Sequence, residues 1–422
     1  MPKVKVFKFG GASVNSAEAV KNMASIIKQH FPSPLVVVVS AMGKTTNQLE
    51  QLVPGILSHD EQSSLWQSLR NYHWDIMSAL FPNPDHPVFS KVSALFDSIR
   101  HQMLVSPSNY NFDYDQTVSF GELISTTIIS EYLNLLGFTN QWVDIRSIIS
   151  TNDHYRNGDV DWSQTQLNTQ SLSNTLSLFP LVVTQGFIAS NNNGFTTTLG
   201  REGSDYSASV LSYCLNAESL TIWKDVDGFL NADPKFFSNT VRIAQIPYNE
   251  AIELSYYGAS VIHPKTVKPL QNKGICLFVK SFISPQGEGS IVGPFDTILP
   301  QTPLYIFKNH QVLLSIMPKD FSFIAEDNLQ TIFHTLAKLG VRVNLMQNSA
   351  LSFSLCLDDN ELLLQQLQDA LSPQFKLRYN RNLQLITIRY YTPSVIDSIV
   401  GSRPILLDQR SRITAQLLVE NP

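Results

Sequence analysis

The 422-residue sequence has few cysteines, few charged residues and no long apolar run. Charged residues make up only 15% of the chain and the net charge is −5, which argues against a surface that binds nucleic acid. Three cysteines, Cys214, Cys276 and Cys356, lie far apart without the spacing of a metal site, so we expect free thiols in a reducing compartment. The sequence also lacks a signal-peptide pattern and any apolar stretch of transmembrane length. We therefore expect a cytoplasmic protein without a membrane partner.

Hydrophobic residues account for 43% of the chain, enough to bury the cores of two or three globular domains. From the start to about residue 290, short apolar runs alternate with helical patterns. The runs at 34–41, 181–189, 219–228 and 275–282 are continuous, which is typical of strands covered on both faces. Ser16 is in position to cap the first helix. These features predict an α/β domain with a mostly parallel sheet sandwiched by helices, whose ligands bind at the carboxyl ends of the strands.

A second domain is predicted after the Gly- and Pro-rich segment 284–296, which is typical of a linker. The order of strand and helix patterns beyond it is βαββαβ, which describes a small ferredoxin-like α+β domain. We therefore place the first domain at 1–295 and the second at 300–422. The stretch 56–120 lacks glycine and carries a helical mixture of apolar residues. It predicts a helical insertion in the first domain, over about residues 50–118.

The stretch KVKVFKFGGASV at residues 3–14 ends a predicted strand with Lys8 and then places Gly10 and Gly11 side by side. Glycine lets a backbone come close to a phosphate, and a lysine there can neutralise a phosphoryl group in transit. The stretch matches neither the P-loop nor the dinucleotide-binding pattern, and an incidental lysine on a surface turn is the alternative. SAMGKTTN at 40–47 follows the next strand and either supplies hydroxyls and backbone donors or merely opens a helix.

The stretch LGREGSDYSA at 199–208 places Arg201 between two glycines, directly before a predicted helix that begins with Ser204 and Asp205. An arginine held on a loop is suited to bidentate binding of a carboxylate, and a helix N-terminus favours anions. The alternative, that Ser204 or Asp205 only caps the helix, leaves Arg201 unexplained. Glu122, in SFGELIS, is predicted to be a buried carboxylate whose partner the sequence does not show.

Lysines and aspartates gather in WKDVDGFLNADPK at 223–235, a turn-rich segment that follows a predicted strand. Lys224, Asp225, Asp233 and Lys235 are of types that suit the phosphates of a nucleotide and their magnesium. An ordinary charged turn is the alternative for this segment taken by itself.

The order of these segments, together with QGFI and GASVIHP, resembles that of the aspartate kinases from Lys8 to about Phe282 and on into the C-terminal part. The resemblance implies an amino-acid-kinase fold followed by ACT-type domains, which are themselves ferredoxin-like. It implies transfer of the γ-phosphoryl group of ATP to the β-carboxylate of L-aspartate with Mg²⁺, the first step toward lysine, threonine and methionine. A glutamate or acetylglutamate kinase and a catalytically silent amino-acid sensor are the alternatives.

The resemblance assigns the candidate residues to three roles. The residues that act on the phosphoryl group in transit are Lys8 and Asp205. Those that bind aspartate are Thr46, Glu122, Arg201 and Ser204, of which Glu122 takes the ammonium group and Arg201 a carboxylate. Those at the ATP site are Lys8, Gly10, Gly11, Ser40, Lys224, Asp225, Leu230, Lys235 and Ser260.

Three positions in the first domain depart from the family's pattern. Glu202 stands between Arg201 and Gly203, where many relatives have glycine, and we expect its side chain to point to solvent. Ser260 takes the place of a lysine that often contacts the nucleotide, and Leu230 that of a tyrosine beside the adenine. These changes predict an altered affinity for the nucleotide rather than a loss of catalysis.

The second domain departs where the family binds its effector amino acid. Asn344 stands where an aspartate takes the effector's ammonium group, and Ala350 where a glutamate is common. An amide gives up the ionic part of that contact, on the order of 1.5–3 kcal/mol for a charged hydrogen bond. After Tyr391 the chain is too short for a second full βαββαβ unit. We predict weak or absent feedback by lysine, and a homodimer in which the open sheet edge of the ACT-type domain pairs with another copy.

Overall fold

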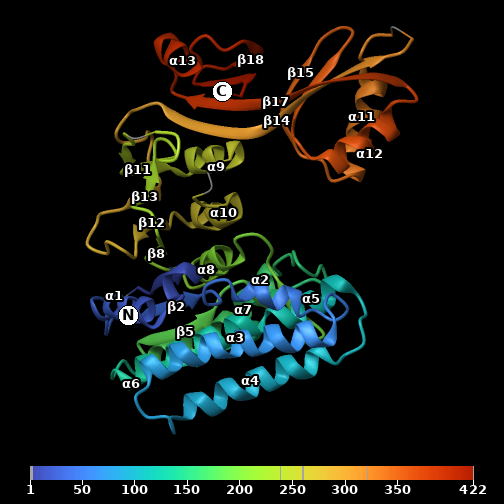
Figure 1. Ribbon diagram of the computed structural model, residues 1–422. Coiled ribbons are helices and arrows are strands. Elements are labelled where there is room, and N and C mark those ends of the chain that lie inside the picture. Colours follow the sequence, from blue (N-terminus) through green and yellow to red (C-terminus); the bar gives the residue numbers. More distant parts are fainter. Residues whose placement is uncertain (1–2, 238, 259–260, 321, 422) are drawn as a thin grey trace. The chain divides into compact units, whose positions relative to one another are not determined.

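The computed structural model describes residues 3–237, 239–258, 261–320 and 322–421, and the chain forms two compact units (Figure 1). The first unit comprises the segments Met1–Phe229, Arg242–Ile252 and Ser260–Pro300. The second comprises the segments Leu230–Val241, Glu253–Ala259 and Gln301–Pro422. Each unit has a sheet and a hydrophobic core of its own.

Two short segments, 230–241 and 253–259, fold with the second unit although they precede the predicted boundary. The N–H of Tyr305 donates to the carbonyl of Asn231 over 2.7 Å, and the rings of Phe237 and Tyr305 stack with their centroids 5.1 Å apart. Contacts of this kind join residues that are far apart in sequence, so the linker pattern gives no sign of them.

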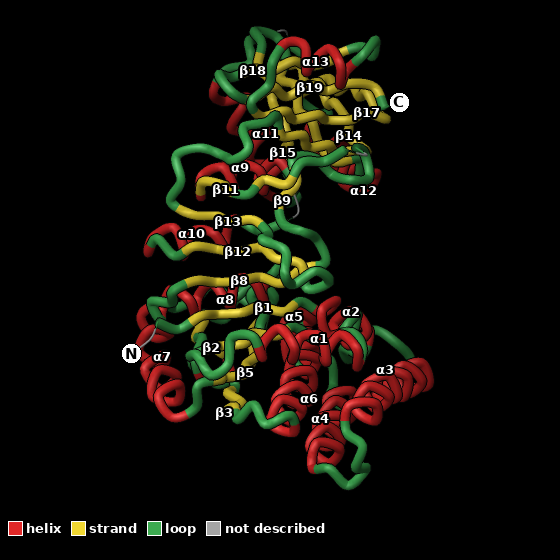
Figure 2. The backbone as a smooth tube through the Cα atoms, turned by 90° about the vertical axis from the view of Figure 1, so that its left-hand side faces the viewer, coloured by secondary structure: helices red, strands yellow, loops and turns green. Residues whose placement is uncertain are grey.

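An eight-stranded sheet forms the centre of the first unit, in the order β11–β13–β12–β8–β1–β2–β5–β3 (Figure 2). Its strands are β1 (Lys5–Phe9), β2 (Leu35–Val39), β3 (Asn140–Val143), β5 (Leu181–Gln185), β8 (Ser219–Lys224), β11 (Gln245–Pro247), β12 (Cys276–Ser281) and β13 (Ser290–Gly293). Among the strand pairs described, only β12 and β13 run antiparallel, which confirms the predicted mostly parallel sheet. Every residue of β2 is buried, as a continuous apolar run covered on both faces requires.

The predicted strand 181–189 is wrong in its extent because the chain turns after Gln185. Phe187 has a φ of 69°, a conformation that a continuous strand does not adopt. Beyond the turn lies β6 (Ile188–Asn191), which forms a separate three-stranded sheet with β4 (Ser150–Thr151) and β7 (Thr196–Thr198). A two-stranded ribbon joins β9 (Phe229–Leu230) to β10 (Arg242–Ile243).

Helices surround the large sheet and also form the predicted helical region. Those of the sheet are α1 (Ala17–Lys28), α6 (Phe120–Leu135), α7 (Trp162–Leu178), α8 (Gly203–Cys214) and α10 (Pro264–Lys273), with short 3₁₀ turns at Gly11–Val14 and Ile145–Ser147. α9 (Tyr248–Tyr257) begins in the first unit and ends in the second. Those between β2 and α6 are α2 (Thr45–Gln51), α3 (His59–Leu80), α4 (Pro87–Met103) and α5 (Tyr110–Val118). Ser16 caps α1 as predicted, because its Oγ accepts the N–H of Ala19 over 3.1 Å.

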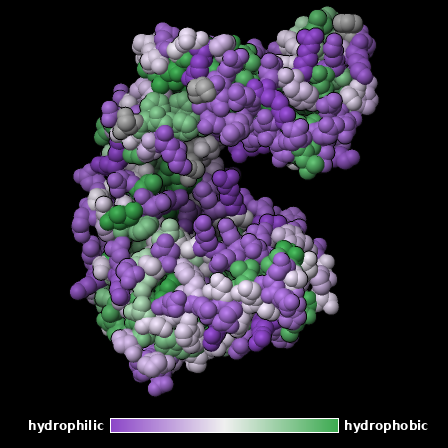
Figure 3. Space-filling model, in the orientation of Figure 1, coloured by the Kyte–Doolittle hydropathy of each residue, from purple (hydrophilic) through white to green (hydrophobic). Residues whose placement is uncertain are grey.

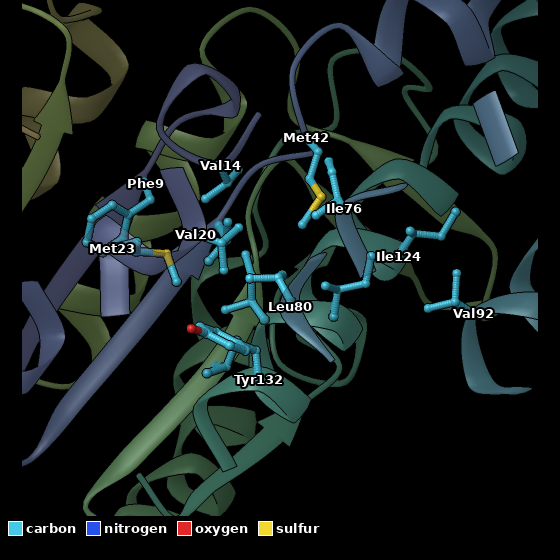
Figure 4. Packing of buried hydrophobic residues seen from close by; sticks show 14 of the residues in the cluster. Phe9, Val14, Val20, Met23, Met42, Ile76, Leu80, Val92, Ile124 and Tyr132 are labelled. Carbon is cyan, nitrogen blue, oxygen red and sulfur yellow. The ribbon is translucent and has the colours of Figure 1, made fainter. Parts of the chain in front are cut away.

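The helical region shares one hydrophobic core with the sheet (Figure 4). Phe9 of β1 and Met23 of α1 belong to the same buried cluster as Leu80 of α3, Val92 of α4 and Ile124 of α6. This shared core holds α2 and α6 against the sheet, and both helices contribute residues to the candidate site described below.

A six-stranded antiparallel sheet, in the order β15–β16–β14–β17–β19–β18, forms the second unit. Its elements are β14 (Leu304–Pro318), α11 (Glu326–Lys338), β15 (Val343–Asn348), β16 (Phe353–Asp358), α12 (Glu361–Leu371), β17 (Phe375–Arg389), α13 (Pro393–Val400), β18 (Ile405–Arg410) and β19 (Thr414–Glu420). The order from β14 to β17 is the predicted βαββαβ, which confirms the predicted α+β class of the second unit. The half built around β18 and β19 carries one helix, α13, in the described part of the chain.

Hydrophilic residues occupy much of the face shown in space-filling form, with hydrophobic residues in separate patches (Figure 3). No helix in the described ranges is both long enough and apolar enough to cross a membrane.

Candidate active site

The carboxyl ends of β1, β2 and β8 lie together because these strands are parallel neighbours in the sheet. Lys8 lies near the end of β1 and Lys224 ends β8. The loops after β1 and β2 and the N-terminus of α8 complete the wall of a cavity of about 330 Å³. Its lining residues are Lys8, Gly11, Ser40, Ala41, Gly43, Thr46, Glu122, Phe187, Gly200, Glu202, Gly203, Ser204, Asp205 and Lys224.

Asp205 joins the two lysines of this cavity. Its Oδ1 lies 2.7 Å from Nζ of Lys8, and its Oδ2 lies 3.4 Å from Nζ of Lys224. Burial by itself raises the pKa of Asp205, but the two ammonium groups outweigh burial and hold that pKa below its ordinary value. Lys224 also donates to the carbonyl of Val261. The site therefore presents two positive charges that are held in place by one shared carboxylate.

Glu122 is the second buried carboxylate of the cavity and has no cation beside it at hydrogen-bonding distance among the described residues. It is 2% exposed, its Oε1 accepts the N–H of Ala41 over 3.2 Å, and its Oε2 is buried without a hydrogen-bond partner in the same part of the chain. Burial raises the pKa of Glu122 to about 8. A carboxylate with an unused oxygen aimed into a cavity can accept hydrogen bonds from a cationic group of a ligand.

Glycines let the loops around the site approach one another closely. A Cβ on Gly11 would lie 2.7 Å from the carbonyl oxygen of Ala41, and the N–H of Gly43 donates to the carbonyl of Gly11 over 3.0 Å. A Cβ on Gly121 would lie 2.9 Å from the Cβ of Ala41. Gly11 and Gly121 are thus required for the contact between α6, the loop after β1 and the loop after β2.

The loop that precedes α8 is bent by two residues in the left-handed region, Gly200 (φ 77°) and Glu202 (φ 54°). Glu202 is the N-cap residue of α8, it lines the cavity, and its Oε2 is buried without a hydrogen-bond partner in the described part of the protein. The expectation that Glu202 points to solvent is therefore wrong. The left-handed backbone at this residue directs its side chain over the cavity, whereas Arg201 beside it is exposed.

The cavity brings together most of the residues predicted for the site. Those that line it are Lys8, Gly11, Ser40, Thr46, Glu122, Ser204, Asp205 and Lys224, and Gly10 adjoins them in the chain. Arg201 and Asp225 are exposed and do not line it, and Leu230 and Lys235 belong to the second unit. Ser260 lies outside the described residues.

Two contributors to the site were not predicted from the sequence, whereas Gly43 belongs to the SAMGKTTN stretch that was predicted to take part. Phe187 follows TQG at the unpredicted turn, and the carbonyl of Val261 binds Lys224 through backbone alone. Neither of these two has a signal in the local sequence.

Glycine-lined loops, two lysines on one carboxylate and an acid with an unused acceptor form a site for anions that also carry a cationic group. An α/β protein with this site at the carboxyl ends of parallel strands belongs to the class of phosphotransferases that act on small charged substrates. The sequence model of the amino acid kinase family matches residues 3–281.

Known proteins similar to this chain show which phosphotransferases it resembles. The chain is 32% identical over 410 residues to lysine-sensitive aspartokinase 3 of Escherichia coli, with 92% of this chain and 87% of that protein covered. It is 29% identical to the aspartokinase of Chlamydia pneumoniae, with 93% and 88% covered. The crystal structure of E. coli aspartokinase III with aspartate and ADP superposes with a TM-score of 0.83 at 29% identity, over 99% of this chain and 96% of that one.

The chain belongs to the aspartokinases of the amino acid kinase family. The predicted resemblance, the fold class and the prediction of a kinase that acts on the carboxyl group of aspartate are confirmed. Aspartate kinase activity is the first step of the pathway to the aspartate-derived amino acids.

Proposed function

We propose that the cavity at the ends of β1, β2 and β8 transfers the γ-phosphoryl group of ATP to the β-carboxylate of L-aspartate, giving 4-phospho-L-aspartate. The product would supply the synthesis of lysine, threonine and methionine. The observation that carries the proposal is the pair of lysines held by Asp205 in the same cavity as the unpartnered oxygen of Glu122.

The reaction needs charge neutralisation more than proton transfer. The β-carboxylate is already ionised at neutral pH, because its ordinary pKa is about 4. Bringing it to a phosphate group opposes two negative charges, which repel by about 4 kcal/mol at 4 Å in surroundings like a protein surface. Lys8 and Lys224 are placed to offset this repulsion, and Asp205 keeps both ammonium groups in position. Backbone N–H groups of Gly10 and Gly11, together with Ser40, would bind the phosphate oxygens.

Aspartate would be bound through both of its ends. Glu122 would accept the α-ammonium group on its unused Oε2. Thr46 and Ser204 line the cavity and offer hydroxyl groups. Arg201 is exposed on the loop before α8, so it would turn inward to pair with the α-carboxylate when the substrate binds.

Asp225 would also belong to the nucleotide site, whereas Leu230, Lys235 and Ser260 stay predictions from the sequence. No three His, Cys, Asp or Glu side chains of the described chain are grouped to hold a metal on their own. A Mg²⁺ ion bound by phosphates needs only one or two carboxylates and keeps its waters, and the exposed Asp225 beside Lys224 fits that need. When bound, Mg²⁺ would neutralise charge on the phosphates.

The second unit would serve dimerisation more than control by lysine. Asn344, at the expected effector position, is 9% exposed and already satisfied: its Oδ1 accepts from Lys308 (2.9 Å) and its Nδ2 donates to Gln311 and Asp358 (both 2.8 Å). β15 lies at an edge of the six-stranded sheet and exposes Met346, and an edge of this kind can pair with a second copy. We further propose that the enzyme acts in the cytoplasm.

The experiment is an assay with ATP, Mg²⁺ and L-aspartate in which the acyl phosphate is trapped as its hydroxamate. Lys8→Ala should abolish turnover, whereas Lys5→Ala, on the same strand in an exposed pair with Glu218, should leave it unchanged. L-Glutamate should give no product. Equal loss in both lysine variants, or equal turnover of glutamate, would contradict the proposal.

A further inference from the structure

Asp115 of α5 is a buried carboxylate that the proposed reaction does not use. It is 0% exposed and accepts three hydrogen bonds. Its Oδ2 accepts the N–H of Arg156 (2.9 Å) and the N–H of Thr198 (2.9 Å), and its Oδ1 accepts the hydroxyl of Thr198 (2.8 Å). All three donors belong to two segments that lie beside the cavity.

The first of these segments leads directly into the arginine loop, Gly200–Gly203. Thr198 ends β7, and only Leu199 separates it from Gly200. The N–H of Gly158 donates to the carbonyl of Thr198 over 2.8 Å, and a Cβ on Gly200 would lie 2.8 Å from Oδ1 of Asn157. The arginine loop thus packs against the turn 154–158. Asp115 accepts hydrogen bonds both from this turn and from the strand that leads into the loop.

The second segment connects Asp115 to the opposite wall of the cavity. Arg156 is held in the left-handed region (φ 66°), with its guanidinium 4.2 Å from the ring centre of Tyr114 and 3.4 Å from Oε1 of Glu50. Glu50 lies on α2, the helix that carries Thr46 at its first turn. One carboxylate therefore holds a network that reaches both walls of the proposed aspartate site.

We propose that Asp115 is a positioning residue for aspartate: through Thr198 and the backbone of Arg156 it fixes the arginine loop against the turn 154–158, so that Arg201 can reach the substrate's carboxylate. This inference rests on the proposed role of Arg201. It assigns Asp115 to the binding of aspartate and not to the binding of ATP or to the phosphoryl transfer.

The network works only while Asp115 can accept all three hydrogen bonds, which its ionised form does. Burial raises the pKa of Asp115 to about 6, although the bonds from Arg156 and Thr198 and the charge of Arg156 oppose that rise. The titratable groups that face it are the guanidinium of Arg156 and the phenols of Tyr114 and Tyr155. As the pH falls through about 6, protonation removes acceptor capacity, and the KM for aspartate should rise.

The test compares substitutions of two buried aspartates on the same helix. Asp113 is 2% exposed and accepts two hydrogen bonds from Ser108, both of 2.8 Å, in a segment with no bond to the arginine loop in the described residues. At pH 8, Asp115→Ala should raise the KM for aspartate by at least about tenfold, with kcat and the KM for ATP changed far less. Asp113→Ala should affect folding stability but not the KM for aspartate.

Asp115→Asn distinguishes positioning from a purely structural role, and it covers the case in which the alanine variant fails to fold. Its amide oxygen can accept from the two backbone N–H groups, but its Nδ2 cannot accept from the Thr198 hydroxyl, as in the protonated acid. The KM of Asp115→Asn at pH 8 should therefore lie between those of the wild type and Asp115→Ala, close to the wild-type value below pH 6. The rise of the KM below about pH 6 should disappear, since the amide does not titrate. Persistence of that rise in Asp115→Asn, or equal changes in all kinetic constants, would overturn the proposal.

Arg201→Ala separates the failure of this proposal from the failure of the proposed function. If Arg201→Ala raises the KM for aspartate and Asp115→Ala does not, the positioning role of Asp115 is refuted, while the role of Arg201 in binding the carboxylate stands. If Arg201→Ala leaves the KM unchanged, the role of Arg201 is refuted, and the positioning role of Asp115 with it.

Discussion

The ammonium group of Lys8 lies 2.7 Å from Oδ1 of Asp205, and the side chains are 10% and 3% exposed. Lys224 approaches the other oxygen of the same carboxylate from the neighbouring strand. The two ammonium groups share a single carboxylate, which holds both of them at one point of the cavity. Cations fixed in this way can stabilise a phosphoryl group that moves between two oxygen anions.

Asp205→Asn removes the charge that holds both lysines. We expect kcat to fall about 100- to 1,000-fold, as it does when a preorganised electrostatic group is lost. Breaking a buried ion pair should also lower the free energy of unfolding by about 3 kcal/mol. Hydroxamate assays and denaturant unfolding measure the two effects. Glu218→Gln, at the exposed pair with Lys5, should change neither, and an active Asp205→Asn enzyme would contradict the assignment.

The raised pKa of Glu122 predicts a pH dependence of aspartate binding. Below about pH 8 the free enzyme carries Glu122 protonated, so an incoming ammonium group must displace a proton. The kcat/KM for aspartate should therefore rise as the pH increases through about 8, at a pH well above the break assigned to Asp115. Glu122→Gln should have a low kcat/KM with no break near pH 8. A wild-type profile that is flat between pH 7 and 9 would contradict the role of Glu122.

The same shift predicts how the stability of the ligand-free enzyme depends on pH. The folded-state pKa of Glu122 lies above the ordinary value of 4.5, so its contribution to stability is complete below that value and is lost as the pH rises through about 8. Relative to Glu122→Gln, the wild type should lose thermal stability between pH 6 and pH 8.5, and aspartate should restore it. Melting temperatures of both proteins, with and without aspartate, measure this difference.

Much of the fold could be predicted because its signals are local. The continuous apolar run of β2, the cap at Ser16 and the βαββαβ order beyond residue 300 are each read from neighbouring residues. The meeting of Lys8 and Lys224 follows from the rule that parallel strands share one carboxyl edge.

The features that could not be predicted depend on contacts between distant segments. The direction of Glu202 follows from a left-handed φ set where Gly203 packs on Phe187, whose ring would lie 2.7 Å from a Cβ there. The role of Asp115 follows from hydrogen bonds to residues 41 and 83 positions away. Neither relationship has a pattern within a short stretch of sequence.

Glu202→Gly should improve both stability and substrate binding. Glycine adopts a φ of 54° without the steric cost that Glu202 bears, which is worth about 1 kcal/mol of unfolding free energy. The substitution also removes a carboxylate that faces anionic substrates, so the KM for aspartate should fall. Asn216→Gly, a left-handed residue just beyond the other end of α8, should leave the KM unchanged. A higher KM in Glu202→Gly would show that Glu202 helps to bind substrate.

Lysine should be a poor inhibitor of this enzyme, because Asn344 is neutral and its amide is fully hydrogen-bonded within the second unit. Titration of lysine and, separately, threonine into the hydroxamate assay measures this directly. Asn344→Asp provides the comparison, since it restores a charge that could bind an effector's ammonium group. Clear inhibition of the wild type at sub-millimolar lysine would contradict the prediction.

Gly121→Ala tests whether the approach of α6 to the loop after β2 controls the site. Alanine ordinarily stabilises a helix interior relative to glycine by about 0.5–1 kcal/mol. Here its Cβ would lie 2.9 Å from the Cβ of Ala41, so α6 would be pushed away from the N–H group that binds Glu122. We expect a loss of about 1–3 kcal/mol in unfolding free energy and a fall in kcat/KM for aspartate.

Gly137→Ala is the matched control for this effect. Gly137 follows the same helix, and a Cβ there would have no atom within 4 Å, so only its φ of 85° opposes the substitution. Gly137→Ala should therefore lower stability without changing the kcat/KM of the folded enzyme. If Gly121→Ala retains full kcat/KM for aspartate, the contact between α6 and Ala41 does not set the position of Glu122, and another element must hold that carboxylate in the cavity.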